Sequence, residues 1–372
     1  MPGRKPKAVV AMSGGVDSSV AAALMKEDGY EVTGIMLKLW KGEAANNESG
    51  CCSVDAAEDA RRVAQVLDIP FYVLNFADQF AGTVIDNFKR RYAAGLTPNP
   101  CVECNRSIKF AALLDRARQY GAQVLATGHY ARTDSVDGRH RLLRAREPAK
   151  DQSYVLYMLG QEELAMARFP VGGYSKPEIR SIAASLALRT ANKPESQDLC
   201  FVPDGDTHAF LADQVPEGSV PGAIVTSDGR RLGRHRGFAH YTIGQRRGLG
   251  IGLGLPLYVT DIRPEDNTVV VAGAGQMQVQ RIEVADARLV SGSPEAELRC
   301  TVMTRYRGAE APAAVQLSGS RATVTFDEPQ QRPAPGQTAV FYVGDEVAGG
   351  GTISRAADLE RTGVTEGREP AA

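Results

Sequence analysis

The chain has 372 residues, enough for two or three domains of ordinary size. It is 43% hydrophobic and 23% charged, which excludes a disordered or fibrous protein, and its net charge of −1 gives no indication of a nucleic-acid partner. No apolar run approaches the roughly 20 residues that a membrane-spanning helix needs. The basic N-terminus is followed by only five apolar residues, Ala8 to Met12, where a secretory signal needs roughly 7–15. We therefore expect a cytoplasmic protein.

Short apolar strands and helical patterns alternate over about the first 200 residues. Strands are expected at 7–12, 32–40, 71–76 and 124–127. Helices are expected at 18–28, 54–67, 80–92, 108–120 and 177–188. Ser175 and Glu178 have the spacing of a capping box for the last of these helices. The alternation predicts a doubly wound parallel sheet with helices on both faces, and we assign residues 1–205 to this α/β domain.

A glycine-rich turn, SGGVDSS at residues 13–19, follows the first strand directly, and a helix begins at once. A buried strand, a glycine turn and a helix N-terminus together form an anion site. Glycines let the backbone approach a phosphate, and the first helical N–H groups point at it. The turn is not a Walker loop, because that motif needs a lysine before its Ser or Thr. Asp17 is the candidate ligand for Mg²⁺, a cation that prefers carboxylate and phosphate oxygens.

A second stretch of interest is TPNPCVECNR at residues 97–106. Its two prolines predict a loop, and loops carry reacting groups more often than helices do. Cys104 is expected directly before a helix, with Arg106 and Lys109 close by. A helix N-terminus and nearby cations lower the pKa of a thiol and favour the nucleophilic thiolate. Cys200, in ESQDLCF at residues 195–201, is the second candidate thiol.

The remaining cysteines have plainer interpretations. A disulfide scaffold is not expected in a cytoplasmic chain of this size. Cys300 lies in an apolar strand and is expected in the core, whereas Cys51 and Cys52 lie in a polar loop, either unreactive or in contact with a metal. Cys101 and Cys104 form a C-x-x-C pair without a second such pair, which argues against a structural zinc site.

Beyond about residue 205 the pattern changes, because glycine and proline become frequent and helical periodicity fades. Strands are expected at 223–226, 257–262, 268–272, 282–285, 298–306, 313–317, 322–326 and 339–343, with a hairpin turn at 344–346. Short strands without helices predict a small β-barrel. We assign 206–280 to a central, mainly β domain, 281–357 to a C-terminal β-barrel and 358–372 to a mobile tail.

Basic residues gather in the central domain. They are Arg230, Arg231, Arg234, His235 and Arg236, followed by Arg246 and Arg247. Such a cluster is either a solvated surface or a phosphate-binding patch. The glycine series at positions 248, 250, 252 and 254 does not indicate a dinucleotide site, because no helix is expected after it.

The motif SGGVDSS resembles the signature of the PP-loop ATP pyrophosphatases, which have an adenine nucleotide alpha hydrolase-like fold. Longer stretches resemble the tRNA-specific 2-thiouridylases (MnmA family). They are TPNPCVECNRSIKF, ATGHYAR at 126–132, KDQSYVLY at 150–157, ESQDLCF, YTIGQRRGLGIG at 241–252, TRYRG at 304–308 and PGQTAVFY at 335–342. The resemblance extends from the glycine turn to about Thr352.

This resemblance implies a reaction. ATP would adenylate the 2-carbonyl of the wobble uridine of tRNA, pyrophosphate would leave, and sulfur would replace the oxygen to give 2-thiouridine. A sulfur donor, either a carrier protein or a cysteine desulfurase, would load a persulfide onto Cys200. Cys104 would attack that persulfide, leaving a disulfide between the two cysteines. The implied RNA partners are tRNAs of the Lys, Glu and Gln type.

The resemblance also implies binding residues. Those for ATP are Ala11, Met12, Ser13, Gly14, Gly15, Val16, Asp17, Ser18, Leu37 and Gly128. Those for the target base are Asn99, Pro100 and Cys101, and those for the rest of the tRNA are His129, Lys150, Asp151, Gln152, Arg305, Tyr306 and Gln337. Lys150 and Arg305 suit phosphate, and Tyr306 suits stacking on an exposed base.

One departure from the family pattern opens a second mechanism. Many members carry Asp where this chain has Cys101, so Cys101, Cys104 and Cys200 would be available as ligands of a 4Fe–4S cluster. The glycine motif alone also fits another PP-loop enzyme, an amide or amine ligase, which needs no paired cysteines. A tRNA-binding or metal-storage module without turnover is the third alternative, and the intact glycine loop argues against it.

Overall fold

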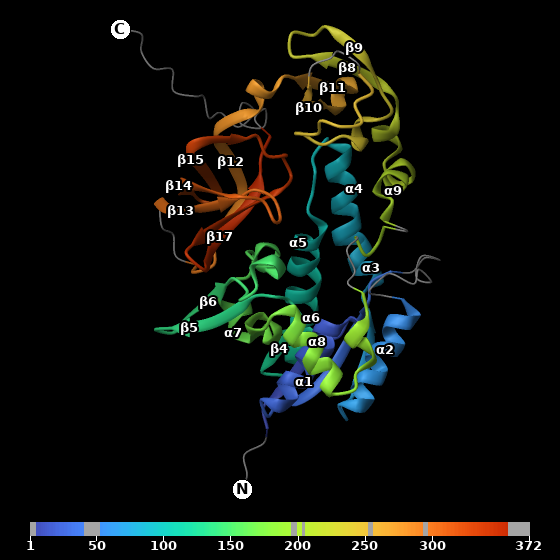
Figure 1. The fold of residues 1–372 in the computed structure, drawn as a ribbon, viewed down its shortest axis with the longest axis vertical. Helices are drawn as coiled ribbons and strands as arrows, with labels where there is room; N and C mark the ends of the chain where they lie inside the picture. The colour runs from blue at the N-terminus through green and yellow to red at the C-terminus, as the bar shows by residue number, and fades with distance from the viewer. Residues whose placement is uncertain are drawn as a thin grey trace.

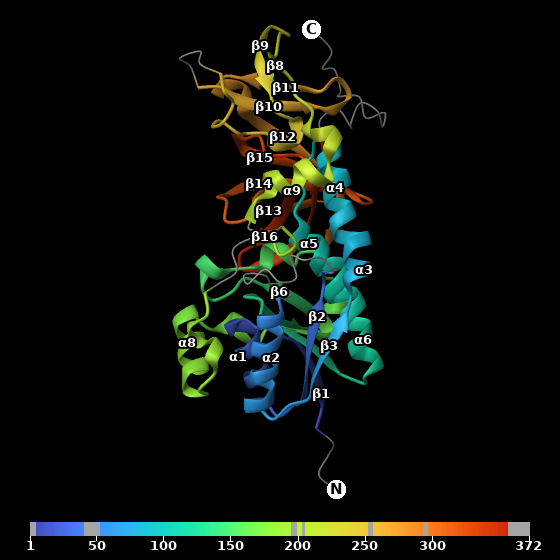
Figure 2. The ribbon, with the colours of Figure 1, turned by 90° about the vertical axis from the view of Figure 1, so that its right-hand side faces the viewer.

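The computed structural model describes residues 5–40, 53–194, 199–202, 205–251, 256–292 and 297–355. The molecule is elongated and carries three sheets (Figure 1). The N-terminal sheet lies at one end of the long axis, the central sheet at the other, and the C-terminal barrel lies between them (Figure 2). Every helix of the described residues is too short or too polar to cross a membrane.

Five parallel strands form the N-terminal sheet, in the order β3-β2-β1-β4-β7. Their bounds are Lys7–Ala11 for β1, Glu31–Lys38 for β2, Phe71–Asn75 for β3, Val124–Thr127 for β4 and Ala167–Arg168 for β7. Val9 belongs to one core cluster, whereas its neighbours Ala8 and Val10 belong to another. Because successive side chains of a strand point to opposite faces, the sheet is buried on both, which confirms the predicted doubly wound fold.

Helices cover the two faces unequally. The face of Ala8 and Val10 carries α1 (Val16–Glu27), α2 (Val54–Val66) and α8 (Lys176–Ser185). The face of Val9 carries α3 (Ala77–Phe80), α4 (Asp86–Ala93), α5 (Pro100–Cys104), α6 (Leu113–Gln119) and α7 (Gln161–Met166). The predicted capping box is present, since Ser175 donates to the Glu178 carboxylate from both its N–H and its hydroxyl.

Two helical runs on the second face contain π-helical segments, Ala81–Ile85 between α3 and α4 and Asn105–Ala112 between α5 and α6. The second run corrects the loop prediction for 97–106, because helix α5 already begins at Pro100. Proline favours the first position of a helix, where its missing N–H has no partner to lose and its φ is already helical. Cys104 therefore lies inside a helix and not before one.

A hairpin that the sequence did not predict joins the α/β domain to the barrel. Its strands are β5 (Arg132–Val136) and β6 (Arg139–Leu143). Strand β6 pairs with barrel strand β17 (Glu346–Ile353) through Leu143 and Glu346. Arg139 donates two hydrogen bonds, of 2.7 and 3.1 Å, to the Glu346 carboxylate. The barrel is thus attached to the domain that carries the glycine turn.

The central sheet has the order β10-β11-β8-β9. Its strands are β8 (Gly222–Thr226), β9 (Arg231–His235), β10 (Tyr258–Arg263) and β11 (Thr268–Ala272), and helix α9 (Thr207–Gln214) precedes them. Three of the strands coincide with predicted ones. Strand β9 and helix α9 were missed, β9 because its arginines obscure the alternation of apolar and polar residues.

Six antiparallel strands form the C-terminal barrel, in the order β12-β15-β14-β13-β16-β17. The five not yet given are β12 (Gln278–Leu289), β13 (Glu297–Met303), β14 (Glu310–Ser318), β15 (Arg321–Gln331) and β16 (Thr338–Val343). Strand β12 also pairs with β17, which closes the barrel, and Val324 and Phe341 are among its fully buried residues. The predicted barrel is confirmed, while the expected tail at 358–372 lies outside the described residues.

Candidate functional site

The glycine turn lies where the strand order of the N-terminal sheet reverses. The chain passes from β1 to β2 and β3 on one side, and returns to β4 on the other side of β1. Ala11, the last residue of β1, is paired with Thr127, the last residue of β4. Such a reversal leaves a crevice at the carboxyl ends of the strands, the usual ligand position in open α/β sheets. Gly128 borders this crevice and packs against the start of α1, where an added Cβ would lie 2.7 Å from the Ser18 nitrogen.

The turn itself is shaped for a backbone that approaches an anion. Gly14 has a positive φ of 73°, and a Cβ there would lie 2.2 Å from the carbonyl oxygen of Ala56. Gly15 caps α1 without a side-chain hydrogen bond to the first helical N–H groups. The Ser18 hydroxyl donates to the Gly15 carbonyl at 3.1 Å and accepts from the Ser13 N–H at 3.1 Å. The sequence-predicted anion site therefore has the geometry that a phosphate requires.

Asp17 is held by two residues from distant parts of the chain. The Lys176 ammonium lies 2.8 Å from each carboxylate oxygen, and the Tyr130 hydroxyl donates at 2.8 Å. A second lysine, Lys193, donates to the Gly14 carbonyl at 3.1 Å and lies 2.7 Å from the Asp59 carboxylate. Sequence reasoning missed both lysines, because 159 positions separate Lys176 from Asp17 and 179 separate Lys193 from Gly14. One carboxylate and two ammonium groups fit a nucleotide phosphate with Mg²⁺, which usually takes one or two carboxylates plus phosphate oxygens.

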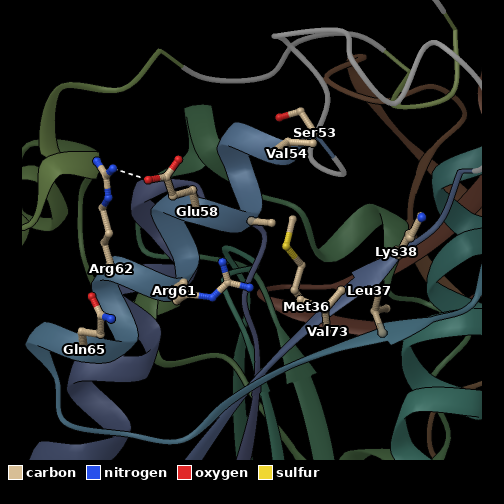
Figure 3. Close-up of a pocket in the computed structure, with 11 residues that line it drawn as sticks. Met36, Leu37, Lys38, Ser53, Val54, Glu58, Arg61, Arg62, Gln65 and Val73 are labelled. Atoms are coloured by element: carbon tan, nitrogen blue, oxygen red, sulfur yellow. Dashed lines mark hydrogen bonds and ion pairs between the residues drawn. The ribbon is translucent and has the colours of Figure 1, made fainter.

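A cavity of about 460 Å³ lies beside the carboxyl end of β2, between this strand and α2 (Figure 3). Its lining combines apolar side chains with polar ones from α2. The lining residues are Met36, Leu37, Lys38, Ser53, Val54, Ala57, Glu58, Arg61, Arg62, Gln65 and Val73. Of the residues predicted to contact ATP, Leu37 alone is among them, so the cavity borders the predicted nucleotide site at one residue.

The two cysteines of the C-x-x-C pair occupy different environments on helix α5. Cys101 is exposed, whereas Cys104 is buried in the apolar core beneath the sheet. Asn99 caps the helix, since its side-chain oxygen accepts from the N–H groups of Cys101 and Val102 at 3.2 and 3.4 Å. The helix N-terminus therefore acts on Cys101 more directly than on Cys104, which contradicts the expected position of Cys104 in front of the helix.

Cys200 is exposed and lies next to a buried aromatic cluster. Its neighbour Phe201 packs edge-on against Phe80, Phe88 and Phe210, with ring centroids 5.2 to 5.9 Å apart. Phe201 belongs to the same core cluster as Cys104, so one apolar core supports both predicted catalytic cysteines. Residues 195–198 and the predicted loop cysteines 51 and 52 lie outside the described residues. Cys300, expected in the core, is half-buried and packs against the barrel core, and burial raises the pKa of its thiol to about 12.

The structure does not show Cys101, Cys104 and Cys200 as a metal-ligand set. Among the residues that the structure describes, no three His, Cys, Asp or Glu side chains gather as a ligand set. The difference in burial between Cys104 and the exposed Cys101 and Cys200 agrees with this. Ligands of a 4Fe–4S cluster surround one compact core of iron and sulfide.

The barrel brings two of the predicted RNA motifs together. Tyr154, from the stretch 150–157, donates to the Thr338 carbonyl at 2.6 Å and lies with its ring centroid 6.0 Å from that of Tyr306. Tyr306 and Arg305 are exposed, and Arg307 lies over the Tyr306 ring. Gln337 donates to the carbonyl of Thr97, just before the cap of α5. The barrel therefore contacts the α/β domain through Tyr306, which lies beside Tyr154, and through Gln337, which binds the segment that leads into α5.

Other predicted RNA residues are engaged within the protein. His129 is buried, its Nδ1 lies 2.7 Å from the Thr127 hydroxyl, and burial together with the Lys109 charge holds its pKa well below the usual value. The Asp151 carboxylate accepts from the Ala145 N–H and the Ser153 hydroxyl. The Gln152 side chain accepts from the Tyr130 N–H, and Lys150 is half-buried. The structure thus gives His129, Asp151 and Gln152 positioning contacts.

Four arginines of the basic cluster, at positions 230, 231, 234 and 236, lie on or next to β9, an edge strand of the central sheet. Arg246 and Arg247 instead follow Gly244 and Gln245, which are hydrogen-bonded to Val259 of β10. The six arginines of the cluster are exposed: Arg230, Arg231, Arg234, Arg236, Arg246 and Arg247. His235 is the exception. It is buried, with Nε2 3.0 Å from the Asn267 carbonyl and Nδ1 accepting from the Gly237 N–H, and burial lowers its pKa.

Comparison with known proteins matches most of the chain. Three family models match in succession: a tRNA methyl transferase HUP domain at residues 6–204, a tRNA methyl transferase PRC-barrel domain at 208–273 and an aminomethyltransferase beta-barrel domain at 279–353. A tRNA-specific 2-thiouridylase MnmA of Chloroflexus aurantiacus is 52% identical over 351 residues, covering 93% of this chain and 98% of that protein. One of Moorella thermoacetica is 49% identical over 357 residues, covering 94% and 100%.

Solved structures resemble the chain more distantly. A crystal structure of a 4-thiouridine synthetase in complex with RNA and bound ATP covers 57% of this chain and 51% of its own, with 19% identity and a TM-score of 0.37. An NMN synthetase from Francisella tularensis covers 51% of this chain and 66% of its own, with 16% identity and a TM-score of 0.33.

Proposed function

The chain belongs to the family of tRNA-specific 2-thiouridylases, and on that basis we propose that it catalyses ATP-dependent 2-thiolation of the wobble uridine of tRNA. The glycine turn at the strand reversal carries this proposal, because it is built for a nucleotide phosphate and precedes a pair of cysteines in the same domain. The enzyme is a sulfurtransferase. Its relatives of about 50% identity cover nearly its whole length, so all three domains contribute.

The first step activates the uridine carbonyl. The 2-oxygen attacks the α-phosphorus of ATP, the bond to the β-phosphate breaks, and pyrophosphate leaves. The first-turn N–H groups of α1 and the hydroxyls of Ser13 and Ser18 bind phosphate oxygens at the glycine turn. Asp17 is the carboxylate that would hold Mg²⁺, which supplies charge neutralisation on the phosphates when bound.

The second step replaces the activated oxygen by sulfur. A donor protein loads a persulfide onto Cys200, whose exposure makes it accessible to such a partner. The Cys104 thiolate attacks the Sγ of Cys200, a disulfide forms, and the released hydrosulfide attacks C2 of the uridine and expels AMP. An external thiol reduces the disulfide for the next turnover. Burial of Cys104 keeps this nucleophile away from solvent oxidants until the step begins.

RNA contacts follow the long axis of the molecule. The exposed arginines on and next to β9 lie at one end, and the barrel, which carries the exposed Tyr306 and Arg305, lies near the middle (Figure 1). Arginines neutralise backbone phosphates without reading sequence, whereas a tyrosine stacks on an unpaired base. We assign the β9 arginines to the tRNA backbone. Tyr306 and Asn99 are assigned to the anticodon loop, from which the target base must leave its stack.

Methyl transfer, the activity in the names of two of the matching family models, is less well supported than thiolation. A simple methyl transfer has no role for a phosphate-binding glycine turn. It also has no role for a pair of cysteines of which one is buried and the other exposed. An amide or amine ligase would use the same turn, but it would tolerate loss of both cysteines. The test is therefore substitution of the cysteines themselves.

Cys104→Ser and Cys200→Ser should each abolish 2-thiouridine formation while ATP binding persists. The readout is nucleoside analysis of tRNA after reaction with ATP and a persulfide donor, with pyrophosphate release measured in parallel. Cys300→Ser is the matched control, because this cysteine lies in β13 and packs against the barrel core, not against the core cluster that contains Cys104. Normal 2-thiouridine from either of the first two variants would contradict the proposal.

A further inference from the structure

Two lysines flank the glycine turn from outside the stretch that defines it. Lys176 is only 7% exposed and forms an ion pair with Asp17 at the start of α1. Lys193 reaches the carbonyl of Gly14 at the centre of the turn and pairs with Asp59 of α2. The two ammonium groups therefore contact the stretch at two different residues, Gly14 and Asp17.

The backbone around Lys176 fixes where its ammonium lies. Lys176 is the first residue of α8, directly after the capping box of Ser175 and Glu178. Its own N–H donates to the Glu147 carboxylate at 2.6 Å, which anchors the helix start a second time. A long cationic side chain that is almost fully buried loses much conformational freedom, so this placement needs a compensating function.

Charge balance indicates what that function is. With Asp17 and Asp59 as counter-ions, the two lysines are neutralised inside the protein. If Asp17 binds Mg²⁺ when the nucleotide enters, Lys176 loses its partner, and a buried ammonium without an anion is strongly unfavourable. The incoming phosphates are the anions that restore the balance.

We propose that Lys176 and Lys193 are phosphate-binding residues, which exchange their carboxylate partners for the β- and γ-phosphates when MgATP binds. The glycine motif itself contains no lysine. These two lysines, which come from the last part of the domain's sequence, then supply the missing positive charge. This assignment rests on the proposed use of ATP. The side chains move between two anions, and no covalent bond changes.

The signature of this exchange is a loss of affinity that depends on the phosphate chain. Lys176→Met and Lys193→Met should each weaken binding of a non-hydrolysable ATP analogue about 10- to 100-fold, the range for a hydrogen bond to a charged group. Binding of AMP, which lacks the two terminal phosphates, should stay within about twofold by the same arithmetic. Calorimetric titration with Mg²⁺ gives both constants. Lys26→Met is the matched control, because Lys26 lies at the far end of α1 and donates to the Leu67 carbonyl.

A double substitution separates phosphate binding from simple neutralisation of Asp17. If Lys176 only compensates the carboxylate, Asp17→Asn in the Lys176→Met background restores ATP-analogue affinity in EDTA. If Lys176 binds phosphate, affinity in EDTA stays low in the double variant. Lys193→Met is a second, independent test at a residue that is less buried, since the Lys193 side chain is 30% exposed.

Equal losses for AMP and the ATP analogue, or restoration by Asp17→Asn, would overturn the assignment. Wild-type affinities in both lysine variants would overturn it as well, while leaving ATP-dependent thiolation intact. Failure of the wild-type chain itself to bind the ATP analogue would count against the proposed function and the lysines together. Thermal melting of each variant confirms that the comparison is made between folded chains.

Discussion

Gln337 in the barrel donates a hydrogen bond from its side-chain amide to the carbonyl of Thr97, 3.0 Å away and 240 positions earlier in the chain. The Thr97 N–H in turn donates to the Pro335 carbonyl at 2.8 Å. Gly336 lies so close that an added Cβ would be 2.9 Å from the Thr97 nitrogen. The barrel therefore holds the segment that leads into the cap of α5, two residues before Asn99.

Gln337→Ala should lower the free energy of unfolding by about 1 kcal/mol, because the half-buried Thr97 carbonyl loses its donor. Chemical denaturation measures the change. Gln316→Ala, on the exposed side of β14, is the control and should stay within about 0.5 kcal/mol of wild type. Equal effects of the two substitutions would show that the contact between barrel and helix is not stabilising.

Asn99 has two candidate roles, and one pair of variants separates them. Asn99→Ala should destabilise the chain by about 1 kcal/mol, because the cap of α5 is lost, and Asn99→Ser should restore most of that stability. If Asn99 also contacts the target base, the serine variant keeps a raised KM for tRNA. Recovery of both stability and KM in Asn99→Ser would leave capping as its sole role.

Gly14→Ala should abolish ATP binding and destabilise the chain by more than the strain of a left-handed backbone alone. That strain is about 1–2 kcal/mol, and the added Cβ would also lie 2.2 Å from the Ala56 carbonyl oxygen. Gly121→Ala is a closely matched control, with a φ of 71° against 73° and no atom within 4 Å of the added Cβ. Calorimetry of ATP binding and denaturation of both variants test the difference, and similar values for the two would be inconsistent with it.

Acidification should destabilise the wild-type protein partly through His129. Burial and the Lys109 charge hold the pKa of His129 well below its usual value of about 6.5, so the native imidazole stays neutral where the unfolded one takes up a proton. Stability is then lost as the pH falls below about 6.5. His129→Gln should flatten the fall in unfolding free energy between pH 7 and pH 5, with a remainder from His235 and His240, whose pKa values are also lowered. An unchanged pH dependence would contradict the assignment.

Arg234→Ala should reduce the salt dependence of tRNA binding. Each phosphate contact contributes about 0.7–0.9 to the slope of log K against log salt, so losing one contact should lower the slope by about that amount. Arg299→Ala is the control, because this exposed arginine of the barrel is paired with Asp327. Identical slopes for wild type and Arg234→Ala would remove Arg234 from the RNA surface.

The sequence predicted the N-terminal sheet well, because buried parallel strands are continuous apolar runs that end in recognisable turns. Strand β4 coincides residue for residue with its predicted range, and the capping box of α8 is formed as expected. The sequence did not predict strand β9, because its exposed arginines mask the alternation of apolar and polar residues that marks a half-buried strand.

The site was predictable where its residues are close in sequence and not where they are distant. The SGGVDSS turn follows its predicted strand and opens a helix, yet Lys176 and Lys193 reach it only because α8 and the segment after it pack against α1 and α2. The start of α5 was misjudged for a local reason. Proline was interpreted as a helix breaker, although at the first helical position it favours the helix.

The hydrogen bonds between Thr97 and the barrel can form only late in the synthesis of the chain. Residues are made from the N-terminus onward, so the α/β domain leaves the ribosome well before the residues around Gln337 exist. The residues that contact the glycine turn all belong to the N-terminal domain, whereas the segment before the cysteine helix gains its hydrogen bonds only when the barrel strands are present. A chain truncated before the barrel would keep the residues of the glycine turn and lose this contact to Thr97. The support of the segment before α5 is therefore acquired last, when synthesis is nearly finished.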